Sequence, residues 1–151
     1  MVVEHVRNVL GFEDADHAES SPDAATLAVT PLSCAVGWGL EGTVVVHPES
    51  RAAELYGGTG ERLESYYCSY GVNPEFRPRL EEAGLRVTGT DPDGEPRIVE
   101  LDRSAHPFFL ATLFIPQARS TPAAPHPLVA GFARAAAVRA RSAGRFAGSG
   151  A

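Results

Sequence analysis

Residues 106–117 read HPFFLATLFIPQ, and this segment decides how the rest of the chain can be arranged. Seven of the eight residues from Phe108 to Ile115 are apolar, and β-favouring types stand at both ends. An apolar run of this length is typical of a strand that is covered on both faces. We therefore expect a central strand over 108–115. Its carboxyl end falls at Pro116 and Gln117, in the place where α/β proteins usually carry their chemistry.

The segments around this strand predict helices and strands in alternation. An amphipathic helix is expected over 1–10, and its apolar pattern is already running at Val2, with no capping side chain before it. Asn73, Pro74 and Glu75 form a compact helix start. A last helix is expected around 128–136, followed by a loose tail. The other expected elements are a connector or edge strand over 27–36, strands over 42–47 and 63–72, a helical turn over 49–56, and a hairpin formed by 85–90 and 98–101.

Composition excludes several classes of partner. The chain has 19 acidic residues against 13 basic ones, all of them arginine, and no basic run interleaved with aromatic residues. Nucleic acid and anionic membranes are therefore not expected partners. No apolar run of membrane-spanning length and no signal-peptide pattern is present, so we expect a cytoplasmic protein. No cofactor is expected.

Residue types alone suggest few sites. The segment from Glu13 to Asp23 contains five carboxylates and His17, but it matches no EF-hand order, so a solvated acidic loop is expected rather than a metal site. Cys34 lies outside any Gly-x-Cys-x-Gly elbow and is expected to be a small buried residue. The tyrosines near Tyr70 can line a pocket or pack in the core, and the pattern leaves both readings open.

Four segments, among them the one at 106–117, carry a family resemblance when they are read in order. They are ESYYCSYGVNPEF at 64–76, LEEAGLRVTGTDPDG at 80–94, HPFFLATLFIPQ at 106–117 and HPLVAGFARAA at 126–136. Together with VVEHVRNVLGFEDADHAES at 2–20, they resemble the class I glutamine amidotransferase domain at the C-terminal end of CTP synthase. The resemblance is nearer still to stand-alone proteins related to the CTP synthase C-terminal region, which carry a segment like Tyr70 to Pro74.

This resemblance implies an α/β fold of the flavodoxin-like, three-layer kind, with helices on both faces of the sheet. We expect the sheet to be largely parallel, with the 85–101 hairpin as an antiparallel addition and the family's opening strands missing. The implied organisation is a partial amidotransferase-like domain over 1–141 and a flexible tail over 142–151.

In the family, a cysteine attacks the glutamine amide while a histidine moves the proton and a glutamate orients that histidine. The matching elbow lies before the first helix of this chain and is absent, and Cys34 and Cys68 fall at other places. The positions that match the histidine and glutamate are Ile115 and Gln117. Isoleucine cannot carry a proton, and neutral glutamine cannot stabilise an imidazolium. The resemblance therefore implies that no catalytic residue of the triad is present.

The glutamine-binding positions are only partly retained. Ser69 stands where the family has an arginine that holds the glutamine carboxylate, and serine cannot replace a bidentate cation. Glu19 matches a glutamate expected to contact bound glutamine. Glu19 and Tyr70 are therefore the candidate substrate-binding residues.

The family role is glutamine hydrolysis that supplies ammonia for CTP synthesis in pyrimidine biosynthesis. The residues predict a CTP synthase-related amidotransferase-like domain that is catalytically inactive as this chain. Two alternatives stay open. The chain can be a non-catalytic binding or regulatory module whose pocket near Glu19 and Tyr70 holds glutamine or another small amino acid. It can also be a fragment of a longer enzyme with a different substrate, which the uncapped helix at Val2 favours.

Overall fold

The computed structural model describes residues 1–32 and 39–147, with side chains described as far as residue 143. The helices are α1 (Val2–Asn8), α2 (Arg51–Tyr56), α3 (Arg77–Glu82) and α4 (Pro127–Ala147), with the short 3-10 helices η1 (Pro74–Phe76) and η2 (Pro116–Arg119). The strands are β1 (Ala15–His17), β2 (Thr26–Pro31), β3 (Leu40–Val46), β4 (Gly60–Tyr66), β5 (Tyr70–Val72), β6 (Leu85–Thr90), β7 (Pro96–Leu101) and β8 (Leu110–Thr112).

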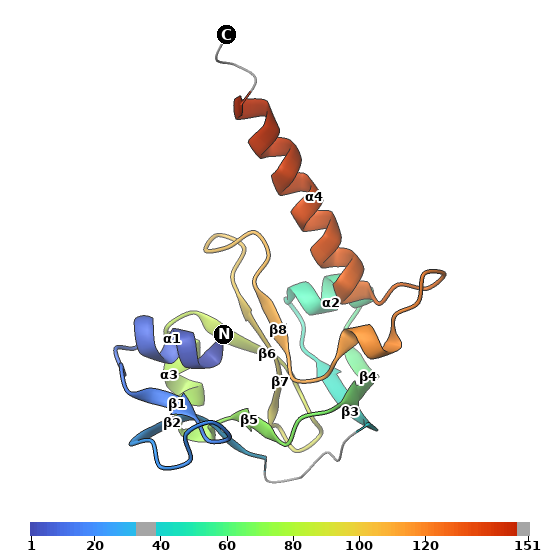
Figure 1. Ribbon diagram of the computed structural model, residues 1–151. Coiled ribbons are helices and arrows are strands. Elements are labelled where there is room, and N and C mark those ends of the chain that lie inside the picture. Colours follow the sequence, from blue (N-terminus) through green and yellow to red (C-terminus); the bar gives the residue numbers. More distant parts are fainter. Residues whose placement is uncertain (33–38, 148–151) are drawn as a thin grey trace.

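The strands form two sheets, one in the order β1-β2-β5 and one in the order β4-β3-β6-β7-β8 (Figure 1). The mixed α/β class is confirmed, but the expectation of a largely parallel sheet is wrong for the described residues. Only β1 and β2 pair in parallel there, and the other pairings are antiparallel. The antiparallel hairpin of β6 and β7 was expected, whereas the antiparallel pairings of β3 with β4 and β6, and of β8 with β7, were not. The direction in which two strands pair depends on residues far apart in the chain, which the pattern within one strand does not record.

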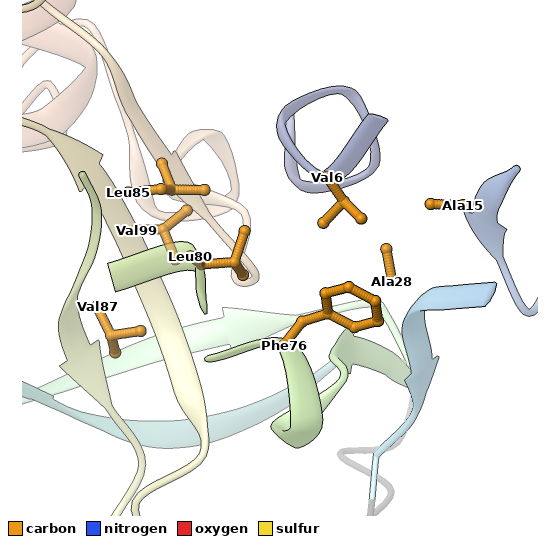
Figure 2. Close-up of a cluster of buried hydrophobic side chains, with 8 residues drawn as sticks. All are labelled: Val6, Ala15, Ala28, Phe76, Leu80, Leu85, Val87 and Val99. Carbon is orange, nitrogen blue, oxygen red and sulfur yellow. The ribbon is translucent and has the colours of Figure 1, made fainter. Parts of the chain in front are cut away.

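Helices cover both faces of the larger sheet, as expected. On one face, α1 and α3 enclose a core of buried side chains that includes Val6, Leu80 and Val99 (Figure 2). On the other face, α2 and α4 pack with Ile98 and Phe114 in a second core. Because successive residues of a strand point to opposite faces, β7 contributes Val99 to the first core and Ile98 to the second.

The predicted central strand over 108–115 is wrong. Its regular part, β8, is limited to Leu110–Thr112 and pairs on one side with β7. Among the described residues, no strand pairs with its other side, so β8 is an edge strand and its three residues are only half-buried. The apolar run correctly indicated that both faces of this segment contact apolar side chains. It carried no information about how many strands lie beside it.

Several local predictions are confirmed. The helix over 1–10 is α1, and Met1 provides no capping side chain. Asn73 accepts a hydrogen bond from the backbone N–H of Glu75, and β6 and β7 form the predicted hairpin. Three boundaries are corrected. The acidic loop contains β1, the segment over 27–36 supplies the middle strand β2 rather than an edge strand, and the segment over 63–72 divides between the two sheets as β4 and β5.

Helix α4 continues to Ala147, so the flexible tail expected from Ser142 is helical over 142–147. The helix extends away from the rest of the molecule, with only its first turns next to α2 (Figure 1). Within the described part of the chain, no helix is both long and apolar enough to cross a bilayer.

Candidate functional site

A cavity of about 320 Å³ lies between the two sheets, beside the start of α1. We call it the intersheet pocket. It is walled by α1, by β1, β2 and β5 of the smaller sheet or the residues next to them, and by β7 and β8 of the larger sheet. Most of the wall is apolar or glycine. Its polar side chains are His17, Cys68, Tyr70, Arg97 and Thr112.

Tyr70 and His17 stand together in this wall. Their ring centroids are 5.1 Å apart, and the planes are tilted by 49°. The candidate residue Glu19 lies nearby along the chain, because its backbone N–H donates a hydrogen bond of 3.1 Å to Nδ1 of His17. Glu19 itself is exposed and does not form part of the wall. The structure therefore places Tyr70 in the pocket and Glu19 close to its His17.

Cys68 is the described cysteine of this region, and Cys34 lies outside the described residues. The Cys68 thiol donates a hydrogen bond to the carbonyl oxygen of Tyr70, and its sulfur accepts one from the backbone N–H of Tyr70. Both contacts measure 3.4 Å. These backbone contacts hold the side chain in the turn before β5. A nucleophilic thiol needs a neighbouring base or cation to form the thiolate, and the backbone of Tyr70 supplies neither.

Ile115 and Gln117 lie at a different cavity. This cavity has a volume of about 470 Å³ and is bordered by β8, by the residues that follow it as far as Gln117, and by Leu128, Val129 and Phe132 of α4. We call it the α4 groove. Ile115 is 39% exposed there, and Gln117 is exposed. Of the residues that border the α4 groove, Thr112 is the one that also borders the intersheet pocket.

The carboxylates of the acidic loop are used in local hydrogen bonds. Asp16 accepts hydrogen bonds from the backbone N–H of His17 and from the Ser21 hydroxyl, and its Oδ2 lies 3.4 Å from Nη2 of Arg7. Those two hydrogen bonds, and then the charge of Arg7, lower the pKa of Asp16. No three His, Cys, Asp or Glu side chains of the described residues are grouped as a metal ion would require.

Arg97 is a buried charged residue that the sequence pattern did not single out. Its side chain is 1% exposed, and Nη2 donates to Oδ2 of Asp91 at 2.6 Å and to Oε2 of Glu95 at 3.1 Å. The guanidinium lies 5.7 Å from the ring centroid of Tyr66. The available signal was a pair of charged residues, Arg97 and Glu100, inside the short strand 96–101, just after a turn that contains two acids.

A second buried polar cluster, Glu64–His126–Tyr56, lies beneath the start of α4. Nε2 of His126 is 2.9 Å from Oε1 of Glu64, and the Tyr56 hydroxyl donates to the same oxygen at 2.6 Å. Nδ1 of His126 accepts a hydrogen bond from the backbone N–H of Leu128, so the ring proton must be on Nε2. Burial, and then the hydrogen bond to Glu64, raises the pKa of Tyr56. Glu64 and His126 are both buried and border neither cavity, so this cluster anchors α4 rather than meeting a ligand.

Comparison with known proteins identifies the family. No family model matches the chain. The CTP synthase of Bifidobacterium longum is 39% identical over 149 residues, which cover 90% of this chain and 27% of that enzyme. The CTP synthase of Acidothermus cellulolyticus is 41% identical over 149 residues, covering 90% of this chain and 26% of that enzyme. The chain thus spans about a quarter of the length of these curated relatives.

A solved structure gives the same result for the fold. The glutaminase domain of Trypanosoma brucei CTPS, solved with bound acivicin, superimposes with a TM-score of 0.81 at 30% sequence identity. The match covers 90% of this chain and 55% of that chain. Over the matched 90% of its length, this chain is a class I glutamine amidotransferase-like domain related to the glutaminase domain of CTP synthase.

Proposed function

We propose that this amidotransferase-like domain does not hydrolyse glutamine and instead binds a small amino acid in the intersheet pocket. The proposal that the domain does not hydrolyse glutamine rests on the identity of two residues. Ile115 and Gln117 occupy the positions that match the family's histidine and glutamate. Neither can carry out the proton transfer that amide hydrolysis by a thiol requires. Supply of ammonia for CTP synthesis is therefore not proposed for this chain by itself.

The proposal that the intersheet pocket binds a small amino acid is supported by the residues around Tyr70. The pocket is of a size that suits a small molecule, and its wall is mainly apolar with a few polar side chains, as in most small-molecule sites. The paired rings of His17 and Tyr70 form one wall, against which the body of an amino acid can lie. The Glu19 carboxylate, two residues beyond His17, is the group proposed to attract the ligand's ammonium. Glutamine is the first ligand to test.

An ammonia assay tests the absence of hydrolysis. The full chain is incubated with glutamine, and released ammonia is measured by a coupled dehydrogenase. We expect the rate to equal that of heat-inactivated protein. Release of ammonia that disappears in Cys68→Ser or Cys34→Ser would show that one of these thiols acts as a nucleophile, and the proposal would then be wrong.

Thermal unfolding tests the binding. A ligand that binds only the folded state raises the melting temperature by mass action. We expect glutamine or another small amino acid at millimolar concentration to raise Tm, and both Tyr70→Ala and Glu19→Ala to reduce the shift. Glu61→Ala, which changes an exposed carboxylate of β4 away from the pocket, serves as the matched control and keeps the shift. If no amino acid changes Tm, the chain has no such binding function.

The cytoplasmic location stays a proposal. It is supported by the similarity to CTP synthase and is tested by imaging the tagged protein in cells.

Partners that are nucleic acids are not proposed, because the net charge is −6.

A further inference from the structure

Arg97 brings an unused hydrogen-bond donor to the intersheet pocket. It borders the pocket and is the one permanently charged side chain among the described residues that do so. Nη1 of its guanidinium is buried, and no atom of the described part of the chain accepts a hydrogen bond from it. A buried N–H group without an acceptor costs free energy, so native proteins rarely leave one unpaired. The acceptor for Nη1 must therefore come from outside the described residues.

The backbone of β7 is irregular at Arg97. The neighbours of Arg97 on either side in the strand pair with Thr90 and Gly89, which are themselves adjacent in β6. Arg97 is therefore the extra residue of a β-bulge. Bulges are common beside functional sites, where they change the direction in which one side chain points. This local geometry sets Arg97 apart from the regularly paired residues of the strand.

The rest of the guanidinium is already held by the protein. Nη2 is shared between Oδ2 of Asp91 at 2.6 Å and Oε2 of Glu95 at 3.1 Å, and the Tyr66 ring centroid lies 5.7 Å away. Because the N–H groups of arginine have fixed directions in one plane, these contacts also fix the direction of Nη1. A ligand that bonds to Nη1 does not have to order the side chain first, and this favours binding.

The charges around Arg97 decide which kind of acceptor fits. One guanidinium faces two carboxylates, so the cluster of Arg97, Asp91 and Glu95 has an excess of negative charge. A carboxylate of the ligand would add a third negative charge where the protein side chains are only 1–20% exposed and water screens little. An uncharged acceptor, such as the carbonyl oxygen of an amide, can bond to Nη1 without this repulsion.

We propose that Arg97 is a specificity residue of the intersheet pocket, and that its Nη1 donates a hydrogen bond to the carbonyl oxygen of a carboxamide on the ligand. The inference rests on the proposed amino-acid function, in which Glu19 attracts the ammonium of the same ligand. The pocket then prefers an amino acid with a carboxamide side chain over one with a carboxylate. It also prefers the carboxamide over an apolar side chain, because an apolar side chain leaves Nη1 unpaired.

Calorimetry with three ligands tests the proposal on the full chain. Glutamine has an uncharged acceptor, glutamate has a charged one, and norleucine has a side chain of similar length with no acceptor. We expect glutamine to bind about tenfold or more tightly than either of the other two. Arg97→Lys keeps a cation beside Asp91 but removes the second guanidinium nitrogen. This variant should weaken glutamine binding about tenfold and leave the other two ligands unchanged.

Two further variants separate the role of Arg97 from other contributions. Arg103→Lys makes the same change in an exposed ion pair that does not border the pocket, so it should keep the preference for glutamine. Glu19→Ala should weaken all three ligands alike, because each of them carries the ammonium. If Arg97→Lys does not fold, hydrogen exchange at the Arg97 side-chain N–H groups of the unchanged chain, followed by NMR, replaces it. Glutamine should slow this exchange more than norleucine does.

Four results would overturn the proposal. Equal binding of the three ligands would mean that a buried water satisfies Nη1, and tighter binding of glutamate would mean that the acceptor is charged. A preference for glutamine that Arg97→Lys keeps, or equal slowing of exchange by glutamine and norleucine, would assign the selectivity to other residues. These results leave the amino-acid function standing. If none of the three ligands binds, the proposed function and the role of Arg97 are both wrong.

Discussion

At the scale of single residues, Arg97 is a buried charge that is held in an ion-pair cluster. It is paired with Asp91 and Glu95, and those side chains are only 11% and 20% exposed. Removing one partner of a buried ion pair leaves the other charges in a poorly solvated place, at a cost of roughly 3–5 kcal/mol. We expect Arg97→Met to lower the free energy of unfolding by about 3 kcal/mol, measured by urea denaturation.

The matched control for this change is Arg103→Met. Arg103 also pairs with a carboxylate, Glu54, but both side chains are more than half exposed. Exposed pairs contribute little because water and salt screen them. Equal destabilisation by the two variants would mean that the burial of Arg97 does not decide its contribution.

His5 of α1 makes stability depend on pH. Burial lowers its pKa below the ordinary value of 6.5, and a hydrogen bond to the backbone of Ala83 opposes this only in part. The unfolded chain therefore binds a proton at this residue at a higher pH than the folded chain does. The contribution of neutral His5 is fully present above about pH 6.5 and is lost as the pH falls from there through the folded pKa.

We expect the urea midpoint of the unchanged chain to fall between pH 7.5 and about pH 5, and this fall to be smaller in His5→Leu. His106→Ala, a change of an exposed histidine, is the control and should keep the slope of the unchanged chain. A fall of the same size in His5→Leu would assign the pH dependence to other groups.

At the scale of elements, the contact between α2 and α4 depends on one glycine. A Cβ on Gly131 would lie 2.5 Å from Cδ2 and 3.2 Å from Cγ of Leu55. Alanine would improve helix propensity by about 1 kcal/mol, but overpacking of this kind costs roughly 1–3 kcal/mol. We expect Gly131→Ala to destabilise the chain by about 1 kcal/mol in thermal or urea unfolding.

The same substitution should reverse its sign when Leu55 is shortened. In the Leu55→Ala background the clash is gone, so Gly131→Ala should stabilise through helix propensity alone. A double-mutant cycle measures this coupling. If Gly131→Ala has the same effect in both backgrounds, α4 does not pack on α2 through this residue.

His126 joins the start of α4 to the sheet through its two ring nitrogens. Its Nδ1 caps the Leu128 N–H, and its Nε2 donates to Glu64. The side-chain oxygen of asparagine can replace Nδ1 as the acceptor for the Leu128 N–H, and the side-chain NH2 group of glutamine can replace Nε2 as the donor to Glu64. We therefore expect His126→Asn and His126→Gln each to lose about 1–2 kcal/mol of stability and His126→Ala to lose more, as measured by urea unfolding. An alanine variant as stable as the asparagine variant would show that the cap contributes nothing.

At the scale of the whole molecule, β7 belongs to both hydrophobic cores. Ile98 is 1% exposed in the core beneath α4, and Val99 is 5% exposed in the core beneath α1. Two cores that share one strand should unfold together. We expect Ile98→Ala to cost about 3 kcal/mol. It should lower hydrogen-exchange protection equally in α1, which contributes Val6 to the first core, and in β3, which contributes Val44 and Val46 to the second. Loss of protection in β3 alone would mean that the cores unfold independently. Phe132→Ala, at a side chain that is 61% exposed, is the control and should change neither.

Much of the local structure was predictable from the sequence. The start of the helix at Asn73, the turn at Asp91–Gly94 and the amphipathic helix α1 rest on contacts within a few residues, and such contacts leave a pattern in the sequence. The identity of Ile115 and Gln117 was equally plain. These residues are the reason to expect no hydrolysis, and no coordinates are needed to see that neither carries a proton-transferring group.

The sequence by itself therefore determined the class of the fold, the family relationship and the identities of Ile115 and Gln117, on which the proposed absence of hydrolysis rests. Only the tertiary structure decided that β8 pairs with β7 alone among the described strands, that Arg97 is buried with Asp91 and Glu95, and that Tyr70 and Ile115 border different cavities. The physical reason is the distance along the chain between the residues that interact. Periodicity records which side of a segment is buried, whereas the neighbours of a strand and the partners of a buried charge are set by residues far away in the chain.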